Sequence, residues 1–516
     1  MGVETLAPPS KKGVEFKPYA TYRLPHARVI AIESEREFGM SVLERLDLEL
    51  RRRGDLFREQ GVQDIRSYRD ANPDHAMPRI LLIIDEFQEF FVQDDKLAQD
   101  AGLLLDRLVR QGRAFGIHVL LGSQTLAGAY SLARSTIGQM AVRIALQCSE
   151  ADSHLILSED NTAARLLNRP GEAIYNDANG MFEGNHPFQV VWLSSQDQER
   201  YLRQLVAKAE KTSSAWPPAI VFEGNAPADP GENVALCKAL QCEDRTSGLA
   251  PQAWLGSAVA IKDPTSVTLR RQSGSNVLMI GQHEEMAMGV FGNALISLAA
   301  TAPTVPDSGQ PTAKFHIFDG TRPDAPETGF WKRVIDGLPV DANVIDVKGT
   351  ASVIHTISEE VRRRMDAADD TASPLFLFIY NLPRFRDLRR ADDDFGFSSL
   401  DDDKPPLPSK QFAEILRDGP AVGVHTLVWC DTFNNVTRWI DRPTLRDLDL
   451  RILCQMSATD SSNLMDSPAA SRLGVHRALL YSEELGEFEK FRPYAPPTDE
   501  WLSLVRDQLA ADRSLA

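Results

Sequence analysis

Short apolar runs alternate with longer amphipathic stretches in the first 200 residues. Runs of about four to eight apolar residues have the length of buried strands, whereas apolar residues spaced three and four apart predict helices. Helices are expected from Ser41, where Glu44 completes a capping-box spacing, and over 97–111. Strands are expected at 27–32, 80–84, 117–122, 142–147, 173–175 and 189–193. This alternation predicts an α/β fold with a mostly parallel sheet flanked by helices.

The same order of elements returns in the second half of the chain, and the residues themselves repeat. His118 and His425 occupy matching places, and both are expected to be packed core residues rather than ligands. The matches keep an offset between 307 and 314, and they pair 110–124 with 417–431, 143–153 with 451–461, 51–53 with 362–364, and 24–25 with 338–339. Four matches in order at a nearly fixed offset indicate a tandem duplication of one α/β module.

Pro-, Gly- and Ser-rich sequence separates the two copies and sets the expected boundaries. We expect a first domain over 10–212, a linker over 213–255, a second domain over 256–496 and a C-terminal tail over 497–516. The second copy begins with an apolar strand, a loop and a helix at 276–300, and the first copy has no counterpart of them in this sequence. The second copy also gains an Asp-rich stretch at 391–405, for which a solvated loop is expected.

Composition excludes several classes of protein. The formal charge is −17, from 56 basic and 73 acidic residues, which argues against a chain that coats nucleic acid but not against a locally basic channel. The longest apolar runs are much shorter than the roughly 20 residues of a bilayer-spanning helix, and the first residues lack a secretory signal pattern. The five cysteines have no CxxC spacing. We therefore expect a cytoplasmic protein without a disulfide framework or a zinc site.

Two places carry side chains that could do chemistry. Asp85 and Glu86 follow the apolar run 80–84, and at the end of a parallel strand Asp85 could hold Mg²⁺ while Glu86 orients or deprotonates a water molecule. Gln124 ends the next core strand, where its amide could sense a phosphate. The alternatives are an acidic turn after a core strand and a polar residue that contacts solvent.

These features together resemble the RecA-like motor domain of the FtsK/SpoIIIE family of ATP-driven DNA translocases. The segments that carry the resemblance are 80–86, 112–125, 142–156 and 166–175, with 11–16 as the tail of an earlier strand. The resemblance implies ATP and Mg²⁺ as cofactors, with Asp85 and Glu86 as the Walker B pair and Gln124 as the sensor. It implies that Arg113 and Arg143 lie near a subunit interface and could complete a neighbour's phosphate site, with surface salt bridges as the alternative. Self-association into a ring, usually a hexamer, is implied as well.

Departures from the family pattern are equally informative. A P-loop needs G-x4-GK[ST], and no such sequence occurs in the 516 residues. At the expected place in the second copy Gly281 is kept, but Met286, Ala287 and Met288 stand where Gly, Lys and Ser or Thr are needed. The Walker B pair and the sensor are also replaced in the second copy, by Tyr380, Asn381 and Asp431. The second domain is therefore expected to be a pseudo-ATPase.

The first copy keeps its Walker B and sensor residues but lacks a P-loop, which favours truncation of the sequence over decay. The resulting hypothesis is the C-terminal portion of an ATP-dependent translocase, with DNA as the expected cargo. The alternatives are a tandem-ATPase protein-secretion motor of the EccC type, with protein as cargo, and a non-catalytic assembly or regulatory module. The chain as given is expected to show no appreciable ATP turnover, because it has no P-loop lysine.

Overall fold

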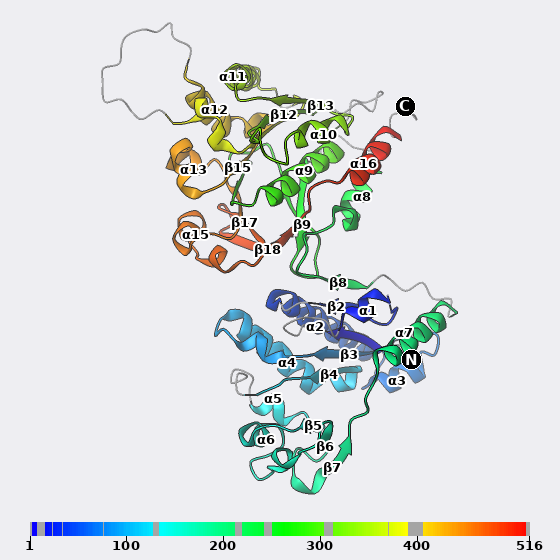
Figure 1. Cartoon of the computed structure of the whole chain (residues 1–516). Coiled ribbons are helices and arrows are strands. Elements are labelled where there is room, and N and C mark those ends of the chain that lie inside the picture. Colours follow the sequence, from blue (N-terminus) through cyan, green and yellow to red (C-terminus); the bar gives the residue numbers. More distant parts are fainter. Residues whose placement is uncertain are drawn as a thin grey trace. The chain divides into compact units, whose positions relative to one another are not determined.

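The computed structural model of the chain forms two compact units (Figure 1). Unit 1 comprises residues 1–225 with 259–261, and unit 2 comprises 226–258 with 262–516. The structure describes residues 3–7, 16–22, 24–32, 35–75, 77–126, 134–211, 219–241, 250–303, 313–369, 371–390 and 406–511. The Asp-rich stretch, the Pro-rich part of the expected linker and most of 11–16 lie outside these residues.

Unit 2 is built on one ten-stranded sheet with the order β10-β9-β18-β17-β16-β11-β15-β14-β12-β13. Its strands are β9 (Gln252–Ala258), β10 (Thr265–Thr268), β11 (Val277–Ile280), β12 (Lys314–Asp319), β13 (Asp341–Ile345), β14 (Leu375–Tyr380), β15 (Val424–Cys430), β16 (Leu450–Leu453), β17 (Ala478–Ser482) and β18 (Glu487–Pro493). The strands from β16 to β13 are parallel, and β11 pairs with both β15 and β16. The expected α/β fold is confirmed.

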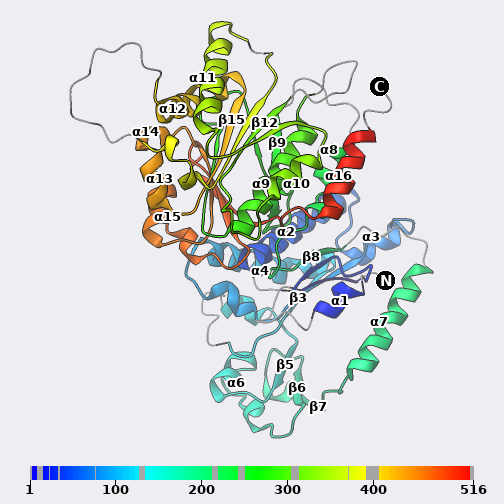
Figure 2. The ribbon, with the colours of Figure 1, turned by 45° about the horizontal axis from the view of Figure 1, so that its top comes forward.

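Helices cover both faces of this sheet (Figure 2). They are α8 (Val234–Leu240), α9 (Glu284–Thr301), α10 (Phe330–Asp336), α11 (Thr350–Asp366), α12 (Pro408–Asp418), α13 (Phe433–Trp439), α14 (Arg442–Leu445), α15 (Ala458–Met465) and α16 (Asp499–Ala511). The helix α9 is apolar on all sides, and every residue from Ala287 to Ala300 is buried. Such a helix belongs to the interior of a layered fold rather than to its surface.

The strands of unit 1 form two sheets. The parallel sheet has the order β4-β3-β1-β2-β8, and the antiparallel sheet has the order β5-β6-β7. The strands are β1 (Val3–Ala7), β2 (Val29–Ala31), β3 (Arg79–Ile84), β4 (Ile117–Leu121), β5 (Arg143–Leu146), β6 (Glu172–Asn176), β7 (Asn185–Gln189) and β8 (Ile220–Phe222). The helices are α1 (Lys17–Thr21), α2 (Arg36–Glu59), α3 (Ile65–Ala71), α4 (Lys96–Phe115), α5 (Arg134–Gly138), α6 (Glu150–Ile156) and α7 (Ser195–Glu210).

Several strands of the two units correspond, and one difference lies beside β4. The strands β3 and β4 correspond to β14 and β15, and β5 corresponds to β16. In unit 2 the strand β11 lies between β15 and β16, whereas no described strand lies between β4 and β5 in unit 1. The sheet of unit 1 is therefore interrupted where β11 stands in unit 2.

Several elements differ from the sequence-based expectations. The helix α2 begins at Arg36, five residues before the predicted capping box, and Ser41 lies inside it with its hydroxyl donating to the carbonyl of Phe38. The expected linker contains β8, α8 and most of β9, and the expected tail contains α16. The helices α8 and α16 fold because they bury apolar side chains in unit 2, among them Leu236 and Val505. The strand β8 pairs with β2 in unit 1.

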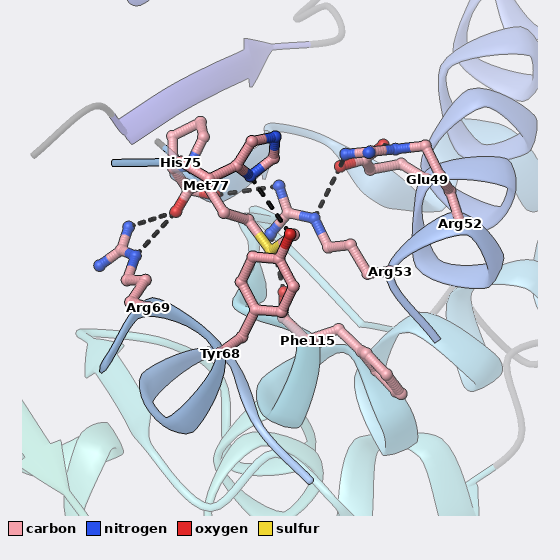
Figure 3. Close-up of polar contacts among 9 residues, drawn as sticks. Glu49, Arg52, Arg53, Tyr68, Arg69, His75, Met77 and Phe115 are labelled. Carbon is pink, nitrogen blue, oxygen red and sulfur yellow. Dashed lines mark hydrogen bonds and ion pairs between the residues drawn. The ribbon is translucent and has the colours of Figure 1, made fainter. Parts of the chain in front are cut away.

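A buried arginine joins the helix α2 of unit 1 to two other segments (Figure 3). The guanidinium of Arg53 donates to the carbonyls of Phe115 (2.7 Å) and Pro78 (3.0 Å) and to the carboxylate of Glu49 (2.6 Å). These bonds tie α2 to the end of α4 and to the start of β3. Because the arginine is 1% exposed, each of its donors needs such a partner.

Unit 2 repeats this joint at the matching positions. Arg364 donates to the carboxylate of Glu360 (2.7 Å) and to the carbonyl of Val422 (3.1 Å) at the end of a short 3₁₀ helix. Ion pairing, first with Arg363 and also with Arg364, lowers the pKa of Glu360 to about 2. The match between residues 51–53 and 362–364 is therefore a repeat of one structural joint.

Replacing Arg53 by Met should destabilise unit 1 by about 2–4 kcal/mol, because two buried carbonyls lose their donor. The matched control is Arg52→Met, since Arg52 pairs with the same Glu49 but its side chain is 55% exposed. The control should change the free energy of unfolding by less than about 0.5 kcal/mol. Urea titration with hydrogen exchange in α2 measures both. Equal effects of the two substitutions would contradict a joint made by the buried arginine.

Candidate functional site

The predicted carboxylates lie at the carboxyl edge of the parallel sheet of unit 1. Asp85 follows the last residue of β3, and Glu86 opens a 3₁₀ helix, Phe87–Phe91. Gln124 follows β4, the neighbouring strand, and leaves the sheet at the same edge. Asp85 is half-buried, Glu86 is 9% exposed, and the side chain of Gln124 is exposed to solvent. The carboxyl edge of an open α/β sheet is where such folds bind their ligands.

Glu86 has a left-handed backbone conformation, with a φ of 54°. Only glycine adopts this region without cost, and asparagine tolerates it better than other residues. The residue at the matching position of unit 2 is Asn381, and its φ is 65°. A glutamate held in this conformation stores strain of the kind that marks functional turns.

The side chain of Glu86 is held by a short relay of hydrogen bonds between the two strands. The amide of Gln88 donates to the carboxylate of Glu86, and the hydroxyl of Ser123 donates to the other end of Gln88 (2.6 Å). Ser123 stands on the neighbouring strand segment, next to Gln124. Neither Gln88 nor Ser123 was predicted from the sequence: Ser123 lies within the segment 112–125, and Gln88 lies two residues after the segment 80–86.

Asp85 occupies space that a glycine leaves open. Its carboxylate accepts from the amide of Glu86 (3.1 Å), and a Cβ at Gly122, the residue after β4, would stand 3.0 Å from its Oδ1. Any larger side chain at position 122 would have to displace this carboxylate. The pair of a small residue on one strand and a carboxylate on the next keeps the carboxylate at the edge of the sheet, where it could hold a divalent cation.

The loop after β4 is fastened to the helix α6. Asp152 accepts from the hydroxyl of Thr125 (2.9 Å), from the amide of Leu126 (3.0 Å) and from Ser149 (2.7 Å). Burial acts to raise the pKa of Asp152, but the hydrogen bonds from Ser149, Leu126 and Thr125 outweigh it and lower the pKa. This carboxylate therefore stays ionised at neutral pH and holds the segment that carries Gln124.

The two predicted interface arginines lie away from this edge. Arg113 is exposed on the last turn of α4, which a left-handed Gly116 joins to the start of β4. Arg143 is the first residue of β5, and its guanidinium donates to the carbonyls of Met140 and Ile156, each at 3.2 Å, and to that of Leu157. In unit 2 Arg451 makes the same kind of contact with main-chain carbonyls. A role of Arg113 or Arg143 at a neighbour's site stays a prediction.

The equivalent edge of unit 2 is filled by aromatic rings instead of carboxylates. Tyr380 replaces Asp85 and packs against Trp331 and Trp429, with ring centroids 5.4 and 4.6 Å apart. Trp429 stands at the position of Gly122, and its indole donates to the carbonyl of Gly281 (2.9 Å). Burial first, and nearby carboxylates second, raise the pKa of Tyr380, so the ring stays neutral.

The loop at the degenerate P-loop position does not fit a nucleotide phosphate. Met286 contacts Cys454 through sulfur (3.4 Å), and the loop borders a cavity of about 370 Å³. Three carboxylates line this cavity, those of Glu284, Glu285 and Glu327. Carboxylates repel phosphate, and no lysine stands at the start of α9 to attract it. The residues present in unit 2 therefore do not support ATP hydrolysis.

In unit 1 the residues at the edge fit part of a Mg²⁺–ATP site. Asp85 offers a carboxylate for the cation, and the strained, buried Glu86 stands beside it, as a water-orienting base requires. Within the described ranges no group of three or more His, Cys, Asp or Glu side chains could hold a metal ion alone. The residues that would hold phosphate are absent from the sequence.

The family model for FtsK/SpoIIIE matches residues 10–128. The ESX-5 secretion system protein EccC5 of Mycobacterium tuberculosis is 32% identical over 151 residues, which are 27% of this chain and 10% of that protein. The solved cytoplasmic domain of the type VII secretion ATPase EccC of Thermomonospora curvata is 17% identical with a TM-score of 0.59, over 99% of this chain and 60% of that one. ATPases 2 and 3 of the same EccC, in complex with a signal sequence peptide, are 13% identical with a TM-score of 0.52, over 96% and 83%.

The matches to solved structures show the fold. The chain has the fold of the tandem ATPase domains 2 and 3 of EccC and EssC proteins. It spans 60% of the matched EccC domain and a tenth of EccC5. In the part of the chain that the structure describes, no helix is long and apolar enough to cross a membrane.

Relief of the left-handed strain at Glu86 should stabilise unit 1. Glu86→Asn removes the carboxylate and relieves the strain, whereas Glu86→Gln removes the carboxylate and keeps the strain. The asparagine variant should therefore be more stable than the glutamine variant by about 1 kcal/mol. Urea titration measures the difference. Equal free energies of unfolding would mean that the conformation at Glu86 stores no strain.

Proposed function

We propose that this chain, a member of the FtsK/SpoIIIE family with two tandem ATPase-type units, is part of an ATP-driven motor that exports protein. The observation that carries the proposal is the likeness to ATPases 2 and 3 of EccC over 96% of the chain, because it includes the degenerate second unit. One of those structures holds a signal sequence peptide. Protein is therefore the favoured cargo, and DNA, the cargo that the sequence resemblance implied, becomes the second candidate.

Unit 1 is the hydrolytic unit in this proposal. Bound Mg²⁺–ATP would supply the electrophilic γ-phosphate, with its charge neutralised by the cation. Asp85 would hold the cation at the edge of the sheet. Glu86, fixed by Gln88 and Ser123, would orient a water molecule and accept its proton. Gln124 would sense the phosphate. Because Asp152 fastens the segment of Gln124 to α6, a change at the site would reach that helix.

Unit 2 has a non-hydrolytic role in this proposal. Its aromatic cluster of Trp331, Tyr380 and Trp429 makes the former site rigid, and the acidic cavity beside it repels nucleotide. Such a unit suits substrate recognition or assembly. We place this portion of the motor on the cytoplasmic side, as in the matched EccC domain, and the ring expected from the sequence resemblance would bring Arg113 of one copy toward another.

The chain as given should show no appreciable ATP turnover, whereas a version that includes a P-loop should hydrolyse ATP. In that version Glu86→Gln should lower kcat by at least about 100-fold and leave ATP binding intact, because only the base is lost. The control is Asn381→Gly at the matching position of unit 2, which should change kcat less than twofold. Coupled-enzyme turnover and nucleotide binding measure both. Robust hydrolysis by the chain as given, lost in Glu86→Gln, would contradict the assignment.

The cargo is tested by two labelled probes at about 150 mM salt, where non-specific DNA contacts weaken. One is the signal sequence peptide of the Thermomonospora complex, and the other is a duplex DNA of 30 base pairs. Saturable anisotropy change with the peptide, absent with a scrambled peptide, is expected. DNA that binds and accelerates ATP turnover of the P-loop version, with no effect of the peptide, would reverse the choice of cargo.

A further inference from the structure

The cavity beside the start of α9 in unit 2 has walls that suit a positively charged ligand. Its volume of about 370 Å³ lies within the usual range of ligand pockets, roughly 300–1,000 Å³. The carboxylates of Glu284, Glu285 and Glu327 line it, together with one guanidinium, that of Arg477. Carboxylates therefore outnumber guanidinium groups in the wall, and the cavity attracts cations.

One of the three carboxylates already pairs with an arginine. The guanidinium of Arg322 lies 3.4 Å from the carboxylate of Glu284, and the side chain of Arg322 is 57% exposed. Such an exposed pair adds little to stability. In the part of the chain that the structure describes, neither Glu285 nor Glu327 forms an ion pair. The wall can therefore be reached by a guanidinium, and two of its carboxylates are left to pair with another cation.

A buried hydroxyl without a partner faces the same carboxylates. Tyr380 is 1% exposed, and its hydroxyl has no hydrogen-bond partner among the described residues. After burial, the charges of Glu284 and Glu327 do most to raise its pKa, so the hydroxyl lies close to these two groups. A neutral hydroxyl can accept from an N–H group and donate to a carboxylate at the same time. A ligand in the cavity would give this hydroxyl the partner that it lacks.

The geometry of the walls favours an organic cation over a metal ion. Within the described ranges no group of three or more His, Cys, Asp or Glu side chains could hold a metal ion. The carboxylates stand on two separate segments, the start of α9 and the loop before α10. A guanidinium has five N–H donors in one plane and can bridge such groups. Met286 and Val475 also line the cavity and suit the aliphatic stem of an arginine.

One residue of the wall has an unfavourable backbone conformation. His476 lines the cavity and has a left-handed φ of 56°. The strand ladders that begin at Arg143 and Arg451 match it with Gly171 of unit 1, whose φ is 79°. Glycine adopts this conformation freely, whereas a histidine stores strain there. Unit 2 therefore places a side chain at the cavity although the backbone would favour glycine, as is common at binding sites.

We propose that this cavity of unit 2 binds the guanidinium of an arginine side chain. The guanidinium would lie between Glu284 and Glu327 and donate to the hydroxyl of Tyr380, and its aliphatic stem would pass over Met286. The binding step depends on the cavity alone. Only the assignment of the arginine to an exported protein rests on the proposed function.

The test uses the full chain and a labelled peptide with a single arginine between glycines. The control peptide carries citrulline, which has nearly the same shape as arginine but no charge. At about 150 mM salt, where distant charges are screened, the arginine peptide should bind at least about tenfold more tightly. Equal affinities overturn the proposal. Displacement by free arginine at the Kd of the peptide shows that the amino acid alone suffices, and much weaker displacement assigns the site to a peptide.

Paired charge removals separate the cavity from the overall charge of the chain. Glu284→Gln with Glu327→Gln should weaken binding of the arginine peptide at least about tenfold. The control, Glu359→Gln with Glu414→Gln, removes two carboxylates that pair with Arg362 on α11 and α12, and should change affinity less than twofold. An equal loss in both double variants would mean attraction by net charge only, and overturns the proposal.

A third variant separates binding from folding. Tyr380→Phe removes only the unpartnered hydroxyl, so the unfolding midpoint should stay the same or rise, yet the arginine peptide should bind about three- to tenfold more weakly. Unchanged affinity in this variant overturns the proposal. Binding of the arginine peptide without binding of the signal sequence peptide contradicts the proposed cargo and supports this inference. The reverse result does the opposite, so the two failures are distinguishable.

Discussion

A parallel sheet is stable when both of its faces are covered, and this requirement explains most of what distinguishes the two units. Parallel strands have no polar face, so their apolar side chains need helices on each side. In unit 2, α9 and α10 cover one face and α11 and α12 the other, and the central strands are buried completely. In unit 1 the counterparts of the same strands have one buried and one open face. Leu120 of β4, for example, is exposed, whereas the matching Leu427 of β15 is buried.

The chemistry of the two edges differs through a pair of exchanges on adjacent strands. Asp85 beside Gly122 leaves a carboxylate with space in front of it, whereas Tyr380 beside Trp429 fills that space with two aromatic rings in a tilted contact. Either exchange alone would pack badly. A Trp at position 122 would collide with the carboxylate of Asp85, and a Tyr at position 85 beside Gly122 would leave a void. The absence of the two carboxylates at this edge of unit 2 therefore goes together with tighter aromatic packing.

The sequence predicted the strands 80–84 and 117–122 and the repeat because apolar runs and motif residues are local signals. It did not predict the burial of Arg53, since the partners of that side chain are main-chain carbonyls, which leave no trace in side-chain identity. The predicted strand 189–193 fails for a related reason: its residues have strand character, but pairing needs a neighbour that the chain does not place there. Gln88 and Ser123 were not predicted, because the hydrogen bond between them depends on the register of β3 and β4.

The left-handed turn shared by Glu86 and Asn381 does not depend on the side chain that it carries. Both copies keep the unusual conformation although only one keeps the carboxylate. A 3₁₀ helix follows the turn in each unit, Phe87–Phe91 in unit 1 and Leu382–Arg384 in unit 2. Asparagine is the non-glycine residue that such a turn accepts most readily, whereas glutamate at the same place carries strain. The turn therefore sets how the chain leaves the edge of the sheet in both units, whichever side chain it carries.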